Sequence, residues 1–119
     1  MKRKTAKTEY IMKAHLRPLP LSESILFRSE DDLFVIQKEN SIIGHFRILP
    51  YSDGLTAYFY DFELEESLRG SGLGNEVFRA IRAFLYNEGF RIIKLQVSRR
   101  NPAAFHLYKN SGLKITESA

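Results

Sequence analysis

The stretch Arg69-Gly70-Ser71-Gly72-Leu73-Gly74 places three glycines within five positions, directly before a long helical pattern. Because glycine has no side chain, such a turn can take positive φ, and a ligand can lie directly against its backbone. The residues that follow predict an amphipathic helix. Its apolar stripe contains Leu73, Val77, Ile81 and Leu85, widened by Phe78 and Phe84. The first N–H groups of a helix have no partner within it, so the turn predicts an anion site, and the usual anion is phosphate.

Two common phosphate-binding patterns are absent from this turn. No Lys-Ser or Lys-Thr follows the glycines, which excludes the P-loop, and Asn75 stands where the dinucleotide fingerprint needs its third glycine. The pattern Arg-x-x-Gly-x-Gly instead resembles the pyrophosphate loop of the GNAT superfamily of N-acetyltransferases. Residues 101–113 resemble the distal signature of that family, in which an Asn opens a helix and a Tyr and a Gly follow. The two segments together indicate a short GNAT member, and the resemblance covers residues 33–116.

The resemblance implies an acetyl-CoA-dependent N-acetyltransferase that moves the acetyl group to a primary amine by direct attack. It implies that the backbone N–H groups of the glycine turn hold the coenzyme A pyrophosphate, and that Arg69 adds a contact. It also implies that the sheet splays near Leu64, whose backbone would pair with the pantetheine arm. The expected coenzyme A residues are therefore Leu64, Arg69, Gly70, Ser71, Gly72, Leu73, Gly74 and Asn101.

Asn101 and Tyr108 each have a structural and a functional interpretation. Asn101 followed by Pro102 is typical of a helix N-cap with proline at the first helical position. The resemblance adds a bond from the same side chain to the pantetheine arm. Tyr108 can be a core aromatic beside Leu107, whereas in the resembled family the matching Tyr protonates the departing thiolate. A phenol suits that role, because its ordinary pKa of about 10 lies above a thiol's pKa of about 8.5.

An amine must lose its proton before it attacks, so the reaction needs a base near the strand that leads into the turn. The two-residue period of a strand puts Phe59, Asp61 and Glu63 on one face of it. Glu63 is the expected base, with Asp61 and His45 as the other candidates, and the structural alternative is a solvated strand face. The three histidines, at positions 15, 45 and 106, show no metal-ligand spacing, so no metal is expected.

The composition fits one folded domain. The chain has 119 residues, of which 44% are hydrophobic and 13% aromatic, and the absence of cysteine excludes disulfides and a cysteine nucleophile. Residues 1–13 hold five basic residues and one acidic residue, whereas the other 13 basic and 13 acidic residues balance, so the net charge of +4 belongs to the N-terminal segment. We expect a flexible basic tail over residues 1–9 and a single domain over residues 10–119. No signal peptide or membrane span is indicated, so a cytoplasmic protein without a nucleic-acid partner is expected.

The order of elements predicts an α/β (α+β) fold with a mixed, mostly antiparallel central sheet and flanking helices. Strands are expected at residues 10–16, 33–36, 41–49, 56–64, 90–97 and 113–116. Helices are expected from residue 73 to a cap at Gly89 and at residues 102–110, and residues 21–29 are expected to be a short helix or irregular. Two features usual in the resembled family are missing. They are the two helices after the first strand, which usually wall the acceptor site, and the seventh strand, which usually seals the sheet.

These omissions lead to a prediction of assembly and leave two rival functions open. Without a seventh strand, residues 90–97 would leave an edge of unpaired N–H and C=O groups, so a homodimer that covers this edge is expected. The shortened N-terminal region is a second argument for the homodimer, since a second chain could supply part of the missing acceptor wall. A non-catalytic acyl-CoA-binding or scaffold domain is the alternative to an enzyme. A third interpretation is a nucleic-acid accessory protein that uses its basic tail.

Overall fold

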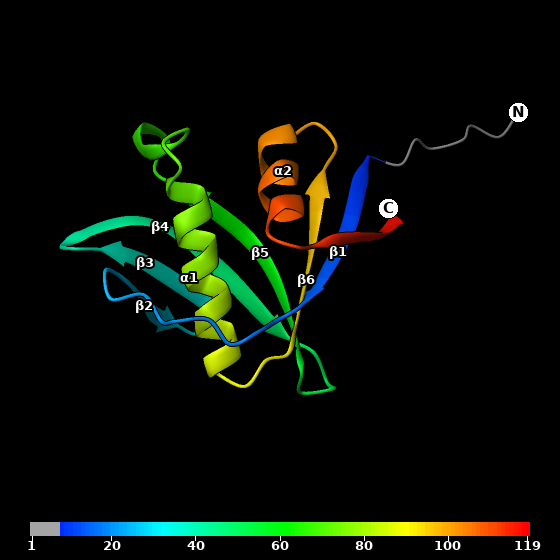
Figure 1. The fold of residues 1–119 in the computed structure, drawn as a ribbon, viewed down its shortest axis with the longest axis horizontal. Coiled ribbons are helices and arrows are strands. Elements are labelled where there is room, and N and C mark those ends of the chain that lie inside the picture. The colour runs from blue at the N-terminus through cyan, green and yellow to red at the C-terminus, as the bar shows by residue number, and fades with distance from the viewer. Residues whose placement is uncertain (1–7) are drawn as a thin grey trace, which may run out of the picture.

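The structure is a computed structural model that describes residues 8–119. Most of the expected basic tail therefore lies outside the described residues, and Glu9 is already the first residue of a strand. Seven strands, two α-helices and one 3₁₀ turn follow along the chain (Figure 1). The elements are β1 (Glu9–His15), β2 (Ile25–Glu30), β3 (Leu33–Lys38), β4 (Ser41–Pro50), β5 (Thr56–Leu64), the 3₁₀ turn Glu66–Leu68, α1 (Leu73–Asn87), β6 (Ile92–Ser98), α2 (Pro102–Asn110) and β7 (Lys114–Ser118).

All seven strands join one sheet in the order β2-β3-β4-β5-β6-β1-β7. Only the β5–β6 pair is parallel, and every other neighbouring pair is antiparallel. The predicted mixed, mostly antiparallel α/β fold is therefore confirmed. A parallel pair needs a crossover connection, and α1 provides it, as in any β-α-β unit.

Both helices pack on the same face of the sheet (Figure 1). Phe78 of α1 and Tyr108 of α2 contact Phe59 of β5, with ring centroids 5.5 and 6.4 Å away, and they lie 5.1 Å from each other. Phe59 and Phe78 are buried, and burial of each such ring contributes about 1.5–3 kcal/mol. No helix of residues 8–119 covers the opposite face, and the segment between β1 and β2 contains none. The helix-free face of the sheet is therefore open.

The two helices form where their sequences predict them. The apolar stripe of α1 is buried, and Gly89 follows the helix with φ 102°, as expected of an αL cap. Asn101 caps α2, because its Oδ1 accepts the N–H of Ala104 at 3.1 Å, and Pro102 is the first helical residue. Local sequence signals thus determine where α1 ends and where α2 begins.

Residues 21–29 differ from the prediction, because the second half of this segment is strand β2 rather than a helix or an irregular stretch. Its residues alternate, with Ile25 and Phe27 directed toward the core and Leu26 exposed. The ring of Phe27 lies 5.1 Å from Phe84 of α1. A tight turn at Asp31, with φ 59°, then returns the chain into β3. The alternation was present in the sequence, but Pro18 and Pro20 just before it favoured an irregular interpretation.

Residues 90–97 also differ from the prediction, because β6 is not an edge strand. It pairs with β5 on one side and with β1 on the other, and β1 in turn pairs with β7. The N-terminal strand β1 thus covers the side of β6 that was expected to be open. Met12 of β1 is 1% exposed, so this strand belongs to the core. The edges of the sheet are β2 and β7, and the predicted homodimer loses its first argument.

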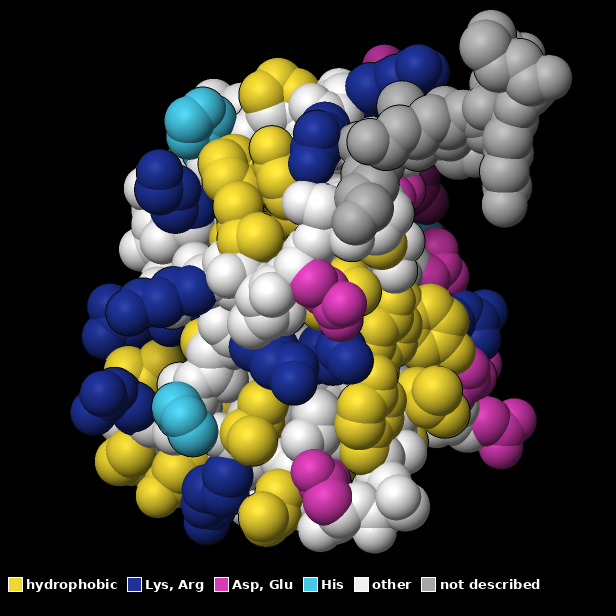
Figure 2. Space-filling view, turned by 90° about the vertical axis from the view of Figure 1, so that its right-hand side faces the viewer, with side chains coloured by type: hydrophobic (Ala, Val, Ile, Leu, Met, Phe, Trp, Pro, Cys, Tyr) yellow, Lys and Arg dark blue, Asp and Glu magenta, His cyan; other side chains and the backbone are white. Residues whose placement is uncertain are grey.

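The surface is divided by charge and polarity. Figure 2, which looks onto the side formed by β1 and β7, shows Lys and Arg side chains with histidine among them on one half and a hydrophobic patch on the other. Neither α-helix of the described part has the length and hydrophobicity to span a lipid bilayer.

Candidate functional site

The sheet opens between β5 and β6. These two strands pair only where Thr56–Tyr58 lie beside Ile92–Lys94, and they diverge beyond that point (Figure 1). The opening forms a cleft of about 800 Å³. Its lining includes Asp61 and Glu63 from the helix-free side of β5 and residues of α1 and α2 from the other side. The cleft therefore passes between the strands and is reached from both faces of the sheet, and α2 stands along it.

The glycine turn forms one end of this cleft. Gly70 and Gly72 have φ of 79° and 81°, in the region that only glycine adopts without strain. A Cβ at either position would meet no protein atom within 4 Å, so backbone conformation, not crowding within the chain, requires glycine here. The Oγ of Ser71 donates to the carbonyl of Leu68 at 2.7 Å, which fixes the turn.

The start of α1 leaves its first N–H groups free. Gly72 is the N-cap and has no side chain to accept a bond, and the first helical bond runs from the N–H of Glu76. Among residues 8–119, the N–H groups of Gly72, Leu73 and Gly74 donate to no acceptor. Free N–H groups at the positive end of a helix dipole attract an anion. The predicted anion site thus has the required backbone geometry.

Leu64 ends β5 at the point where the strands have separated. Its carbonyl accepts the Nε–H of Arg69 at 3.1 Å. The same guanidinium lies 3.8 Å from Glu63. Arg69 is therefore directed toward the end of β5, where it organises the strand end beside the cleft. The expected pairing of the Leu64 backbone with a pantetheine arm stays a prediction.

Tyr108 satisfies both interpretations drawn from the sequence. It is 7% exposed and packs edge-on against Phe59, and it also lines the cleft. Burial raises the pKa of Tyr108 to about 12, so the phenol keeps its proton at neutral pH. Its hydroxyl makes no hydrogen bond within the described residues, which leaves it available to a ligand in the cleft.

A bulge in β5 determines which side chains face the open side. Arg47 pairs with Tyr60 and His45 pairs with Glu63, so β5 has one more residue than β4 over this stretch. Asp61 takes φ 53°, a conformation that Asp tolerates better than most residues. The expected alternation is therefore wrong for Phe59, which packs in the core under the helices. Asp61 and Glu63 do share one face, as expected, but the bulge places Tyr60 there with them.

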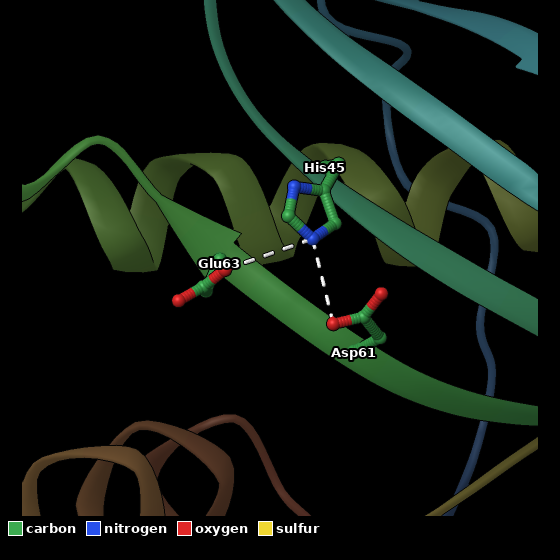
Figure 3. A group of neighbouring side chains, drawn as sticks. All are labelled: His45, Asp61 and Glu63. Carbon is green, nitrogen blue, oxygen red and sulfur yellow. Dashed lines mark ion pairs between the residues drawn. The ribbon is translucent and has the colours of Figure 1, made fainter.

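His45, Asp61 and Glu63 meet on this face (Figure 3). The Nε2 of His45 lies 3.4 Å from Asp61 Oδ1 and 3.8 Å from Glu63 Oε2. The ligand atoms of the three side chains all lie within 4.8 Å of one another, which is close enough to bind one small cation. A protonated amine and a divalent metal ion are both cations of this kind. No sequence spacing indicated this cluster, because its members come from two strands and His15 and His106 lie elsewhere.

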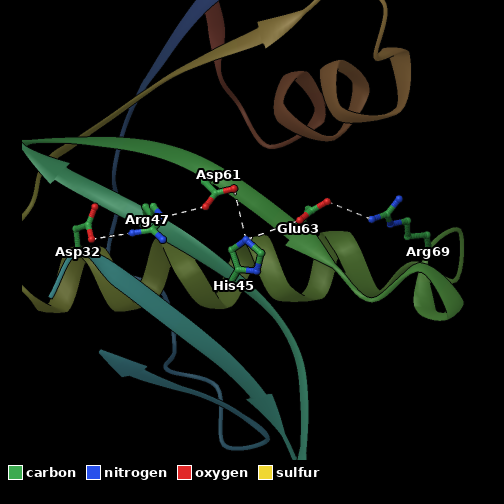
Figure 4. Close-up of polar contacts among 6 residues, drawn as sticks. All are labelled: Asp32, His45, Arg47, Asp61, Glu63 and Arg69. Carbon is green, nitrogen blue, oxygen red and sulfur yellow. Dashed lines mark hydrogen bonds and ion pairs between the residues drawn. The ribbon is translucent and has the colours of Figure 1, made fainter. Parts of the chain in front are cut away.

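The cluster is part of a longer row of ionisable side chains in contact, which runs Asp32, Arg47, Asp61, His45, Glu63 and Arg69 (Figure 4). Arg47 bridges Asp32 and Asp61 with two contacts of 2.9 Å, and the hydroxyl of Tyr60 donates to Asp32 at 2.7 Å. The hydrogen bond from Arg47 lowers the pKa of Asp61, and the one from Tyr60 lowers the pKa of Asp32. Both carboxylates are thus held ionised, whereas Glu63 has only the looser contacts of 3.8 Å.

Comparisons with known proteins agree with this geometry. The model of the acetyltransferase (GNAT) family matches residues 4–113. No curated protein matches the chain. An acetyltransferase from the GNAT family of Colwellia psychrerythraea is similar in structure, with a TM-score of 0.73 and 11% identity, over 95% of this chain and 54% of that one. A GCN5-related N-acetyltransferase from Sphaerobacter thermophilus has a TM-score of 0.67 and 15% identity, over 92% of this chain and 48% of that one.

A third similar structure is an aminoglycoside acetyltransferase from an uncultured soil metagenomic sample, solved in complex with sisomicin. Its TM-score is 0.55 and its identity 21%, over 71% of this chain and 59% of that one. The chain thus spans about half to three fifths of the length of these solved structures, and at such identities the likeness concerns the fold alone.

Proposed function

This chain belongs to the GNAT family of acetyltransferases, and we propose that it moves the acetyl group of acetyl-CoA to a primary amine by direct attack. The observation that carries the proposal is the cleft between the diverging strands β5 and β6. At one end the cleft has a turn of free N–H groups, and in its wall it has a protonated phenol. These two groups suit the two ends of the reaction, since a pyrophosphate needs N–H donors and a departing thiolate needs a proton.

The residues that hold acetyl-CoA are those around the glycine turn. The N–H groups of residues 70–74 bind the pyrophosphate, and the dipole of α1 strengthens the contact. The pantetheine arm enters the gap beside Leu64, where β5 has no strand on its β6 side. Asn101 faces the same cleft, and its Oδ1 is taken by the helix cap, so its amide group is the part that remains for the arm.

Tyr108 and Glu63 divide the proton transfers. The amine nitrogen forms a bond to the thioester carbonyl carbon, the C–S bond breaks, and the sulfur takes the proton of Tyr108. The acceptor ammonium loses one proton to Glu63 before it attacks, and the proton that its nitrogen loses after the C–N bond forms restores the proton of Tyr108. Asp61 is less suited to this, because Arg47 lowers its pKa. His45, 3.8 Å from Glu63, can take the proton onward.

The acceptor amine approaches from the helix-free face, where His45, Asp61 and Glu63 attract a cation. Two carboxylates beside the cleft favour an ammonium group over a neutral or anionic acceptor. The similarity to an aminoglycoside acetyltransferase bound to sisomicin supports an amine acceptor, without fixing which one. Specificity depends on the wall around the acceptor, and in residues 8–119 that side of the sheet carries no helix.

The same open face is also compatible with a non-catalytic acyl-CoA-binding domain, because no helix of the described residues forms a wall for an acceptor there. Turnover separates the two. The chain is incubated with acetyl-CoA and a panel of polyamines, amino sugars and lysine peptides, and free thiol is measured over time. Thiol release that depends on the amine supports the enzyme, and coenzyme A binding in calorimetry without thiol release on any amine supports the binding domain.

A homodimer remains part of the proposal, now with the open face as its reason. A second copy lying on the helix-free face would supply the missing wall of the acceptor site and would cover exposed apolar side chains such as Leu26 and Leu49. Sedimentation equilibrium at micromolar concentration decides this point. A monomer throughout would mean that the acceptor site works without a second chain.

A further inference from the structure

A second, basic pocket lies on the side of the molecule formed by β1 and β7. It has a volume of about 410 Å³ and shares no lining residue with the cleft. Its charged or titratable lining residues are Lys13, His15, Arg17, Arg82 and Lys114, and no Asp or Glu lines it. Figure 2 looks onto this side and shows basic side chains gathered there. Charges of one sign in a concave surface focus the potential and attract the opposite charge.

Arg82 is the lining residue that has an unsatisfied polar group. It lies on α1, where its Nη1 donates to the carbonyl of Ser111 at 3.3 Å, while its Nε is buried and has no hydrogen-bond partner. It forms no ion pair within residues 8–119. Burial and the neighbouring Arg79 both lower the pKa of Arg82. A half-buried guanidinium without a carboxylate costs free energy, and a bound anion would offset that cost.

The strand register shows how the lysines near the pocket are arranged. Lys94 on β6 stands directly opposite Lys13 on β1, and Lys13 stands directly opposite Lys114 on β7. Like charges opposite each other on neighbouring strands are destabilising. The charge of Lys13 contributes to lowering the pKa of Asp53, although this carboxylate mainly accepts hydrogen bonds from the N–H groups of Leu55 and Thr56. Strand alternation puts these three side chains on the helix-free face, because Met12 next to Lys13 packs in the core, and Lys94 lies 5.2 Å from the ring centroid of Tyr51. Of this row, only Lys13 and Lys114 border the pocket, at the sheet edge.

From the buried, unpartnered Nε of Arg82 and the basic lining of the pocket, we infer that the basic pocket binds a small anion carrying phosphate or carboxylate groups. Its volume lies within the range of about 300–1,000 Å³ found for small-molecule sites. The anion meets Arg82 at the wall of α1 and Arg17 in the segment after β1, with Lys13 and Lys114 at the sheet edge. Arginine suits such a ligand, because its planar fork pairs with phosphate and carboxylate oxygens bidentately.

The test is a titration of the full chain, labelled with ¹⁵N, with inorganic phosphate in one arm and citrate in the other. Ionic strength is held constant with sodium chloride, and the chain is saturated with coenzyme A so that the glycine turn is occupied. Saturable amide shifts confined to residues 13–19, 82 and 111–114 support the site, and the arm with the lower dissociation constant identifies the anion class. Shifts confined to the glycine turn, or no saturable shift in either arm, overturn it.

Matched variants separate a built pocket from general attraction to basic charge. Arg82→Met keeps most of the aliphatic stem, and Arg17→Ala serves if that variant does not fold, because Arg17 is exposed. Each should weaken binding about tenfold or more, whereas Arg28→Ala, on the far edge strand β2, should leave it unchanged. An equal loss in Arg28→Ala would overturn the inference, because it would show non-specific attraction.

Discussion

At the scale of single residues, Tyr108 has two roles that one substitution separates. Tyr108→Phe keeps the ring against Phe59 and Phe78 and removes only the proton donor. We expect kcat to fall about 10²-fold with little change in acetyl-CoA affinity. Since burial raises the pKa of Tyr108 to about 12, wild-type activity should show no loss from tyrosine ionisation below about pH 11. Stopped assays across pH measure both effects, and an unchanged kcat would leave Tyr108 as a core residue only.

Glu63 gives a second residue-scale prediction, which concerns pH. Glu63→Gln removes the proton acceptor and should lower kcat about 10²-fold at neutral pH, where the acceptor is almost entirely ammonium. The difference in kcat between wild type and variant should shrink as pH approaches about 10, because a large fraction of a lysine-like acceptor amine is then already deprotonated. Asp61→Asn is the matched control, since Arg47 already holds that carboxylate ionised, and it should show no such pH-dependent rescue. Equal behaviour of the two variants would reject Glu63 as the base.

Gly72 tests the anion site at the same scale. Its positive φ makes any other residue strained by about 1 kcal/mol, and a side chain there enters the cleft. Gly72→Glu should therefore abolish coenzyme A binding in calorimetry while the protein stays folded. Gly54→Glu is matched in strain, with φ 70° and open space around its Cβ, but it lies in the loop between β4 and β5. That variant should bind coenzyme A normally, and a loss in both would point to folding instead of the site.

At the scale of elements, the sequence predicted what local signals control and missed what strand pairing controls. Gly89 ends α1 and Asn101 begins α2, and both residue types are typical of those positions, so both helices could be placed from sequence. The bulge at Asp61 depends on how β5 aligns with β4, and the row of side chains from Asp32 to Arg69 comes from the β2–β3 turn, the strands β4 and β5, and the glycine turn. No periodicity within one segment contains that information. The candidate catalytic residues were therefore found one by one, whereas their grouping required the structure.

The close approach of β4 and β5 leads to an element-scale prediction. A Cβ at Gly44 would overlap the carbonyl oxygen of Glu63, so the strands cannot keep their spacing if this residue is alanine. Gly44→Ala should lower the free energy of unfolding by about 1–3 kcal/mol and should shift Glu63 relative to His45. Gly74→Ala, whose Cβ would make an ordinary 3.9 Å contact with Leu107, should be neutral or stabilising. Denaturant unfolding compares them, and equal stability of the two variants would contradict the close-approach argument.

At the scale of the whole molecule, the N-terminal strand β1 joins the two ends of the chain in one sheet. It lies between β6 and β7, and backbone bonds link Thr8 and Glu9 to Ala119. Deletion of residues 1–7 should leave folding and coenzyme A affinity unchanged, because it keeps Thr8 and its backbone bonds to Ala119 and Arg99. Deletion through His15 should prevent cooperative folding, because β6 and β7 would then lose their shared partner and Met12 would be missing from the core. Thermal unfolding followed by circular dichroism measures both. A cooperative transition in the longer deletion would show that the sheet closes without β1, and a loss of coenzyme A binding in the shorter one would give residues 1–7 a direct part in the site.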